Sequence, residues 1–528
     1  MAVVEHWTPE RSAAGRHSPW LIASIISIAT FMEVLDTSIA NVALNHIAGG
    51  LSASYDEATW VLTSYLIANA IAVPISGWLS NIIGRKRFYM ISVALFTVSS
   101  FLCGIAPNLT FLILARIAQG IGGGGLAPSE QSILTETFPP QQRGLAFSLY
   151  GFTIIFGPIV GPTIGGIITD NISWHWIFLI NVPIGLLSLF LVQTFVVDPP
   201  KLEQERRARL KGGLKIDGPG IALLALWLGC MEFVLDRGQR EDWLSSDLVK
   251  VFLVVSVLSC IVLWIWEWNR RDPVFDVKLF ANYSYLINVL VMGATGVVLY
   301  GTTQLIPQFL QEVMGYTASD AGKAMTLGGL GTLVVLPAVG FMSTKVQPKW
   351  LLLVGIATEA LALWGFTHID GQVSWWSVSI ARLWLAVGLP FLFVPINTSA
   401  YAGIPPEKVA DASAQLNLAR NLGGSIGISI SQALIVQRSQ AHQWRLTETL
   451  NPLDPRYRGW LQQLTGAFSS QGAAAGQAAT HQIYQAVVRQ AQVLGYIDTF
   501  WLLAVATAAV MPLILLMKKV DPGAAPAA

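Results

Sequence analysis

The sequence predicts an all-α membrane protein with fourteen transmembrane helices, arranged as two six-helix halves with two inserted helices between them. Of the 528 residues, 53% are hydrophobic and only 12% are charged, whereas a soluble domain usually carries about 25% charged residues. The apolar runs are unbroken and close to the 20 or so residues that a helix needs to cross a bilayer. Such runs exclude a β-barrel, whose strands would alternate in polarity. A long-range internal repeat divides the chain into halves.

The apolar runs are separated by polar loops that set the expected topology. Because the number of spans is even, both termini, 1–19 and 518–528, should lie on one side. Lys and Arg are concentrated in the loops of that side, for example at Arg85 and Lys86 and in 201–215, so the positive-inside rule predicts that both termini are cytoplasmic. The expected spans are 20–44, 59–78, 88–106, 109–131, 145–169, 174–197, 217–235, 248–268, 283–306, 321–343, 350–366, 376–400, 413–436 and 496–517.

The repeat has a constant offset of 266 residues. LARIAQGIGGGGL from Leu114 matches IARLWLAVGLPFL from Ile380, which carries Arg116 onto Arg382. The same offset carries Gly157 onto Gly423 in the following span. A register kept across a helix, a loop and another helix indicates duplicated halves. The expected parts are an N-terminal half at 20–197, a basic cytoplasmic loop at 198–216, two inserted helices at 217–268 and a C-terminal half at 283–517 that includes an outer loop at 437–495.

Several stretches together carry a family resemblance. They include LDTSIANVAL from Leu35, GWLSNIIGRKR from Gly77, LARIAQGIGGG from Leu114 and GPIVGPTIGG from Gly157. With them the chain resembles the 14-spanner drug:proton antiporters of the major facilitator superfamily, the EmrB/QacA group. The resemblance implies two pseudo-symmetric halves with a substrate site near the midplane. It also implies proton-coupled export, and no enzymatic activity.

The buried charges of the first and fourth spans are the expected proton-coupling residues. Asp36 and Arg116 each lie about 10–12 Å from the outer ends of their helices, so they could face each other. A pair that forms and breaks would act as a proton switch, whereas a static ion pair would only orient two helices. The offset carries Asp36 onto Thr302, so the duplicated scaffold does not require an acid there. The resemblance assigns proton coupling to Asp36, and Glu33 is either a second protonation site or a hydrogen-bonded polar residue.

Other polar residues of the expected spans receive weaker assignments. Glu130 and Glu232 lie near expected span ends, where long acidic side chains reach the interface. Glu359 is expected to be a helix-packing partner. The residues expected to line the substrate cavity are Asn41, Gln119, Arg382 and Arg420.

The fifth span carries regularly spaced small residues. Gly157, Gly161 and Gly165 recur every four residues, so they share one helix face and allow close approach of a neighbour. The intervening prolines each remove a helix hydrogen bond. The pattern indicates either tight packing alone or the conformational motif of exporters that the resemblance implies. The full motif is Gly157, Pro158, Gly161, Pro162, Gly165 and Gly166.

The loop after the second span matches the superfamily's cytoplasmic gating signature at Gly77, Gly84, Arg85 and Lys86. It departs from that signature at Asn81, where the family has an acid. A charge latch between the halves is one interpretation of the loop, and the missing carboxylate argues against it. Basic residues that only obey the positive-inside rule are the other.

The energy source is expected to be a proton gradient. The stretch GYTASDAGKA from Gly315 has the wrong spacing for a phosphate loop, and Ala324 replaces its Ser or Thr. No HExxH or paired-cysteine pattern is present, so neither a metal nor a cofactor is expected. A net charge of +1 gives no reason to expect nucleic-acid binding.

The expected function is proton-driven export of small hydrophobic or amphipathic compounds across the lipid bilayer of the bacterial inner membrane. The long outer loop 437–495 has two helical arms. These arms either dock a periplasmic adaptor that leads to an outer-membrane channel, as the resemblance implies, or cover the protein's own outer mouth. A dedicated exporter of a metabolite, such as a siderophore, a lipid or an organic acid, is the alternative. A non-transporting membrane anchor or receptor is another.

Overall fold

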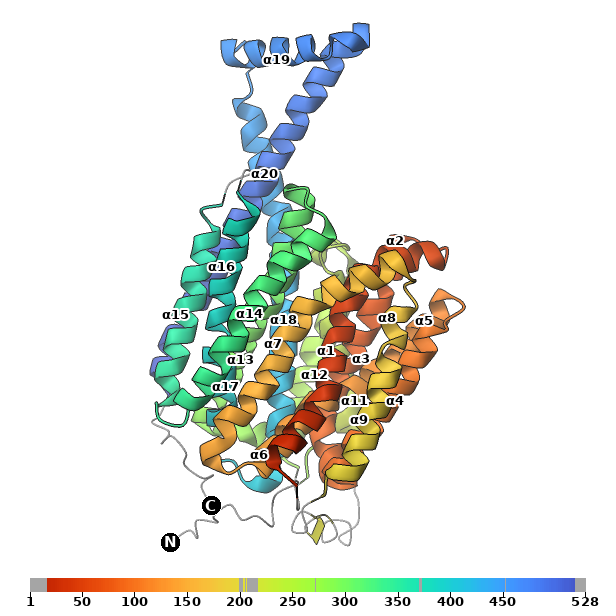
Figure 1. The fold of residues 1–528 in the computed structure, drawn as a ribbon, viewed down its shortest axis with the longest axis vertical. Coiled ribbons are helices and arrows are strands. Elements are labelled where there is room, and N and C mark those ends of the chain that lie inside the picture. The colour runs from red at the N-terminus through yellow and green to blue at the C-terminus, as the bar shows by residue number, and fades with distance from the viewer. Residues whose placement is uncertain are drawn as a thin grey trace.

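The computed structural model describes residues 17–198, 203–204, 206, 217–270, 272–369, 373–451 and 453–517. The secondary structure of this part of the chain is helical throughout (Figure 1), which confirms the all-α class. The expected N-terminal segment, most of the basic loop at 198–216 and the C-terminal tail lie outside the described residues.

Each half of the bundle contains six membrane-length helical stretches. In each half two of them, the fourth and the sixth, are broken into consecutive helices. In the N-terminal half the fourth stretch breaks at Gly124, and in the C-terminal half the equivalent stretch breaks at Leu389. The N-terminal helices are α1 (Pro19–Gly50), α2 (Tyr55–Ala58), α3 (Trp60–Ile83), α4 (Arg85–Gly104), α5 (Leu109–Gly123), α6 (Leu126–Thr137), α7 (Arg143–Asn171), α8 (Trp176–Leu179) and α9 (Asn181–Phe195). The C-terminal helices are α13 (Tyr283–Gln308), α14 (Ala318–Met342), α15 (Pro348–Phe366), α16 (Trp375–Gly388), α17 (Pro390–Ala400), α18 (Val409–Thr449), α19 (Pro455–Ala467), α20 (Ala475–Ala508) and α21 (Met511–Leu515).

Thirteen helical stretches in the described residues are long and apolar enough to cross a membrane. The expected span 413–436 lies in α18, which is not among the thirteen. α18 carries polar side chains in this region, and Gln415, Asn417 and Arg420 are all buried against other helices. An interior helix can therefore be polar along its buried face and still belong to the transmembrane bundle.

The repeat detected in the sequence corresponds to equivalent helix pairs. Glycines of α7 pack against α1, and the offset glycines of α18 pack against α13. At the contact between the halves, Gln131 of α6 donates through Nε2 to Oδ1 of Asn397 in α17 at 3.0 Å. These two residues are themselves separated by 266 positions, so each repeat contributes the same position to one contact.

The halves meet along two helix pairs, α7 with α14 and α3 with α18. A Cβ on Gly144 of α7 would lie 2.7 Å from the carbonyl oxygen of Gly340 in α14. A Cβ on Gly77 of α3 would lie 2.9 Å from the carbonyl oxygen of Ala410 in α18. Both contacts lie at the end of the bundle where the α3–α4 turn at Gly84 is found, which we call the Gly84 end. We call the opposite end, beyond which α19 projects, the α19 end (Figure 1).

The inserted helices α11 (Gly218–Arg237) and α12 (Asp247–Trp268) pack beside the α3–α18 contact. Asp236 of α11 accepts a hydrogen bond from the Thr63 hydroxyl of α3. Glu232 of α11 accepts one from the Ser425 hydroxyl of α18 at 3.0 Å. α11 therefore bonds to both halves of the bundle.

Candidate functional site

Asp36 lies in the middle of α1 and is 2% exposed. Its carboxylate accepts three hydrogen bonds from side chains of other helices. Arg116 Nη1 lies 2.6 Å from Oδ2, and Asn181 Nδ2 and Gln119 Nε2 lie 2.7 and 3.0 Å from Oδ1. The contact expected between Asp36 and Arg116 is therefore present. One cation and two amide donors compensate a buried carboxylate that would otherwise be costly in this environment.

Arg116 of α5 is fully buried and is held from several directions. Its Nε donates to the carbonyl oxygen of Val61 at 3.0 Å, and Nη1 also donates to Gln119 Oε1 at 2.6 Å. The guanidinium carbon lies 4.2 Å from the centre of the Tyr65 ring, within cation–π range. Arg116 therefore keeps partners of its own in addition to Asp36, so a proton on Asp36 would not leave the guanidinium isolated.

Glu33 lies one turn from Asp36 on α1 and is 9% exposed. Its Oε1 accepts from Asn69 Nδ2 at 3.2 Å and from the Tyr65 hydroxyl at 3.5 Å. Its Oε2 has no hydrogen-bond partner among the described residues. Tyr65 therefore contacts both Arg116 and Glu33: its ring packs against the Arg116 guanidinium, and its hydroxyl faces the Glu33 carboxylate.

The second repeat has the equivalent arginine without the equivalent acid. Arg382 of α16 is fully buried, and its Nη1 donates to the Thr302 hydroxyl at 3.5 Å. The carboxylate of Glu359 in α15 interacts electrostatically with this guanidinium. Arg382 was expected in the substrate cavity; in this conformation its side chain is buried beside Thr302 of α13 and Glu359 of α15, and the cavity assignment stays a prediction. Glu359, also fully buried, packs on Gly388 of α16, in accord with its expected packing role.

The other residues expected in the cavity have different positions. Gln119 is fully buried in the Asp36 cluster in this conformation, and its assignment to the substrate cavity stays a prediction. Arg420 is 4% exposed and donates through Nη1 to the Tyr150 hydroxyl at 2.6 Å, across the contact between the halves. Asn41 alone is exposed, on the part of α1 between Asp36 and the α19 end.

A buried polar network around Gln131 joins the halves near the Gly84 end. Besides its bond to Asn397, Gln131 accepts through Oε1 from Asn417 Nδ2 at 2.7 Å and from the Tyr401 hydroxyl at 3.0 Å. The Tyr150 hydroxyl of α7 donates to Asn417 Oδ1 at 3.0 Å. Sequence reasoning missed these residues, although a glutamine and an asparagine in apolar spans at the repeat offset were a usable signal. The network closes the Gly84 end of the bundle.

The glycine face of α7 packs on α1 beside Asp36. A Cβ on Gly157 would lie 2.7 Å from Val34, one on Gly161 would lie 2.5 Å from Ser38, and one on Gly165 would lie 3.0 Å from Ile39. The Ser38 hydroxyl donates to the carbonyl oxygen of Pro158 at 3.1 Å, which the proline at position 162 leaves without its helix donor. The predicted close approach is present and its partner is the helix of Asp36. Gly166 has no neighbour within 4 Å, so it takes no part in this contact.

The gating loop contacts the opposite half. Asn81 Nδ2 lies 3.3 and 3.4 Å from the two carboxylate oxygens of Asp411, in the first turn of α18. Arg85 pairs with Glu136 and also donates through Nη2 to the carbonyl oxygen of Pro406 at 3.4 Å. A latch between the halves therefore exists without the family's acid, because α18 supplies the carboxylate and α3 the amide.

The turn at Gly84 is held within the N-terminal half. Gly84 has a φ of +98°, a backbone conformation that glycine adopts without a steric penalty. The Lys86 backbone amide donates to Asp198 Oδ1 at 2.9 Å, and its ammonium donates to the carbonyl oxygen of Gln193 at 2.9 Å. Lys86 therefore fixes the turn to the end of α9.

Two acidic residues are more deeply buried than expected. Glu130 of α6 is fully buried and Glu232 of α11 is 3% exposed, so neither reaches a polar interface. Glu130 accepts from the Ser27 hydroxyl of α1 at 2.5 Å. The expected span 109–131 ends beside Glu130, whereas the helix continues to Thr137, which moves Glu130 inside the bundle.

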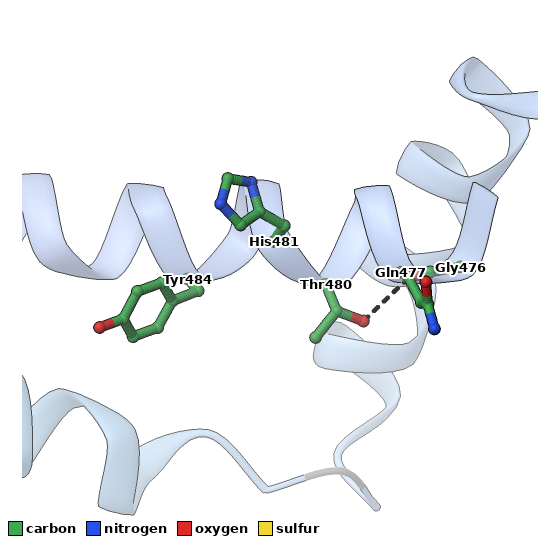
Figure 2. A pocket seen from close by; sticks show the side chains of 5 residues that line it. All are labelled: Gly476, Gln477, Thr480, His481 and Tyr484. Atoms are coloured by element: carbon green, nitrogen blue, oxygen red, sulfur yellow. Dashed lines mark hydrogen bonds between the residues drawn. The ribbon is translucent and has the colours of Figure 1, made fainter. Parts of the chain in front are cut away.

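The outer loop forms a projection beyond the bundle. α18 continues to Thr449, α20 begins at Ala475, and α19 lies across their tips (Figure 1). Both arms are helical, as predicted. Gly476, Gln477, Thr480, His481 and Tyr484 of α20 line a surface hollow on the projection, and Figure 2 shows Tyr484 and Thr480 on the side of α20 that faces the other arm.

Comparisons with known proteins agree with this fold and these motifs. The model of the Major Facilitator Superfamily matches residues 26–428. A protein of Haemophilus influenzae named multidrug export protein EmrB is 36% identical over 487 residues, which cover 92% of each chain. The fatty acid resistance protein FarB of Neisseria gonorrhoeae is 32% identical and covers 94% of this chain and 96% of its own. The solved structure of the proton:xylose symporter XylE superposes with a TM-score of 0.60 at 14% identity, covering 95% of this chain and 96% of that one. The chain therefore belongs to the major facilitator superfamily of membrane transporters, with EmrB proteins among its relatives.

Proposed function

We propose that the protein is a proton-driven exporter of small hydrophobic or amphipathic compounds across the bacterial inner membrane. The observation that carries the proposal is the asymmetry between the repeats. The arginine of each repeat is buried in the same place, but Arg116 faces Asp36 whereas Arg382 faces Thr302. The second repeat has a hydroxyl at the position of Asp36, and the carboxylate near its arginine is Glu359 of another helix. An acid at the Asp36 position is therefore kept for a task that only one half performs.

The arginine and the two amide donors around Asp36 stabilise its charged form in this conformation, so proton uptake belongs to a state in which these contacts have loosened. A proton from the outside neutralises Asp36 and weakens its bond to Arg116, which frees α1 and α5 to shift relative to each other. The glycine face of α7 transmits that shift, since it packs on α1 at Val34 and Ser38, two residues to either side of Asp36. Substrate loading from the inside and proton entry from the outside then alternate, as an antiporter requires.

The conformation described here is closed at the Gly84 end by the Gln131 network and the Asn81–Asp411 contact. We assign this end to the cytoplasm, because the basic residues of the sequence cluster in its loops and the positive-inside rule favours that orientation. The protein is thus held with its inner gate shut. Opening it requires several hydrogen bonds between the halves to break together.

The projection is proposed to dock a periplasmic adaptor that leads to an outer-membrane channel. Its tip exposes large apolar side chains, including Trp444 at 65% and Leu453 at 70% exposure. Apolar side chains in such a position, rimmed by polar residues, are typical of a protein-binding surface. The hollow lined by Gln477, Thr480, His481 and Tyr484 lies on the same projection, and its lining is mostly apolar.

We infer the substrate class from the names of the relatives. EmrB is named for multidrug export and FarB for fatty acid resistance, and both substrate types combine apolar bodies with polar groups. A dedicated exporter of one such metabolite is the second candidate, and the FarB relative favours a lipid-like substrate for it.

The test uses purified protein in proteoliposomes with an imposed pH gradient and ethidium as the transported probe. Wild-type protein should move ethidium against its gradient, and Asp36→Asn should reduce that rate by about 100-fold or more. The control is Thr295→Val in the C-terminal half, which changes a buried hydroxyl away from the Asp36 cluster. Asn41→Ala is unsuitable as a control because Asn41 lies on the same helix as Asp36. Unchanged pH-driven transport by Asp36→Asn would remove the coupling assignment. A protein that moves fatty acid but not ethidium would support the dedicated exporter.

Adaptor docking is tested separately by deleting 445–490 and joining the arms with a short Gly/Ser linker. The deleted protein should insert and fold, because this segment lies outside the bundle, but should no longer co-purify with a coexpressed adaptor. Retained co-purification would place the docking surface elsewhere.

A further inference from the structure

α1 carries a polar thread that the proposed coupling site uses only in part. In this mostly apolar helix, Ser27, Thr30, Glu33 and Asp36 follow each other at intervals of three residues. All four are buried, with exposures of 6%, 0%, 9% and 2%. Residues three apart are neighbours on a helix surface, so the four side chains form a continuous line that winds around α1. The line is about 13 Å long at 1.5 Å per residue.

Glu130 is bound to the other end of this thread. Its Oε1 accepts from the Ser27 hydroxyl at 2.5 Å, and the Thr30 hydroxyl lies beside the same carboxyl group. The thread therefore has a carboxyl group at each end, Asp36 toward the α19 end and Glu130 toward the Gly84 end. Glu33 lies between them.

Three oxygen atoms along the thread lack hydrogen-bond partners among the described residues. They are Glu33 Oε2, Glu130 Oε2 and Thr30 Oγ1; the Thr30 hydroxyl interacts with the Glu130 carboxyl group, but without normal hydrogen-bond geometry. Unpaired polar atoms inside a bundle are rare and call for an explanation. Here they are consecutive members of one line, and a proton on a carboxyl oxygen would give a neighbouring oxygen the donor that it lacks.

The surroundings of Glu130 connect it to the inner gate. The next residue, Gln131, holds the hydrogen bonds to Asn397 and Asn417 that keep the Gly84 end closed. Glu130 is thus the member of the thread nearest in sequence to these bonds, and a separation of the halves at this end would act on its neighbourhood. The charged and titratable groups around it are Arg420 on α18, Tyr89 on α4 and Tyr150 on α7, which interact electrostatically with the carboxyl group.

We infer that Glu130 is the inner proton-release site of the transporter, supplied from Asp36 through Glu33 and the Thr30 hydroxyl. This inference rests on the proposed proton-driven export. Asp36 passes its proton to Glu33 and becomes a carboxylate again. The Thr30 hydroxyl accepts the proton from Glu33 while giving its own to Glu130. Glu130 releases the proton to the cytoplasm when the inner gate opens, and each group ends in its starting state.

The decisive variants are Glu130→Gln, which keeps the shape but cannot carry a proton, and Glu130→Asp, which keeps the carboxyl group. In proteoliposomes with a pH gradient, Glu130→Gln should lower the net rate of ethidium transport by about 100-fold, with ethidium affinity unchanged. Ethidium exchange at equal pH on both sides needs no net proton transfer, so it should persist. Glu130→Asp should restore part of the net rate. Thr30→Val should also slow net transport, whereas the matched change Thr295→Val should not.

A second measurement does not depend on transport. Infrared difference spectra of the purified protein between high and low pH report carboxyl groups that gain a proton, and Glu130→Gln should remove one such band that Thr295→Val retains. Wild-type net transport by Glu130→Gln, or an unchanged set of carboxyl bands, would overturn the inference. If the wild-type protein showed no pH-driven transport, the proposed function would fall, and the infrared result would still decide whether Glu130 exchanges protons.

Discussion

Gly161→Ala tests whether the close packing of α7 on α1 holds the Asp36 helix in place. The new Cβ would lie 2.5 Å from both Cβ and Oγ of Ser38, whereas carbon atoms in contact lie about 3.5–4.0 Å apart. The Ser38 Cβ cannot move by rotation of its side chain, so the two backbones must separate by about 1 Å. Overpacking of this kind costs about 1–3 kcal/mol. Loss of the Ser38–Pro158 hydrogen bond adds about 1 kcal/mol, and the higher helix propensity of alanine offsets about the same amount.

Gly166→Ala, one residue beyond Gly165 in the same helix, is the matched control because it meets nothing within 4 Å. It should be neutral or stabilising by up to about 1 kcal/mol. The free energies of unfolding of the two variants should therefore differ by about 1–4 kcal/mol. The difference should appear as a lower temperature at which detergent-solubilised Gly161→Ala loses its monodisperse peak in size-exclusion chromatography. Gly161→Ala should also slow pH-driven ethidium transport, since α1 carries Asp36. Equal thermal stability of the two variants would refute the packing argument.

Three further predictions concern the contact between the halves and the second repeat. Asn81→Asp places two carboxylates about 3.3 Å apart against Asp411, where like charges repel, so labelling of a cysteine introduced beside the inner gate should become faster; slower labelling would contradict the latch. Tyr150→Phe leaves a buried guanidinium nitrogen of Arg420 without its 2.6 Å acceptor, which should lower the free energy of unfolding by about 1–3 kcal/mol in a thermal-shift assay; no change would show that another acceptor replaces it. Thr302→Asp places an acid opposite Arg382, the arginine of the second repeat, and should raise thermal stability. In a double variant with Asp36→Asn, the new acid should not restore pH-driven transport. Restored transport would show that the asymmetry between the repeats is not functional.

The fold was predictable because its signals are long and repeated. Apolar runs of bilayer length and a constant offset over several helices each involve tens of residues, and a local exception does not change them. The contact between Asp36 and Arg116 was predictable for a related reason, since charges at equal depth in neighbouring spans have few other partners. The span in α18 shows the limit of hydropathy, because a helix enclosed by others needs no apolar surface of its own.

The missed features depend on which way a side chain faces. Glu130 looked like a residue at a span end, because the polar stretch that follows it resembles a loop, but the helix continues to Thr137 and keeps it inside. Arg382 and Gln119 looked like cavity residues because they are polar and central, and in this conformation each has specific partners that lie far away in the sequence. The 13-helix hydropathy pattern contains no information on these partners. They follow only from the packing of one helix against another.

The hydrogen bond between Gln131 and Asn397 has a consequence for the origin of the chain. In a symmetric dimer, a residue on the twofold axis meets its own copy, and the interface is self-complementary. Here the same position of the two repeats still meets at that axis, within a single polypeptide. A six-helix ancestor that paired with an identical copy would have made this contact with itself. Within one polypeptide each of the two positions can change alone, so Gln131 can meet Asn397, and Asp36 of one half can correspond to Thr302 of the other.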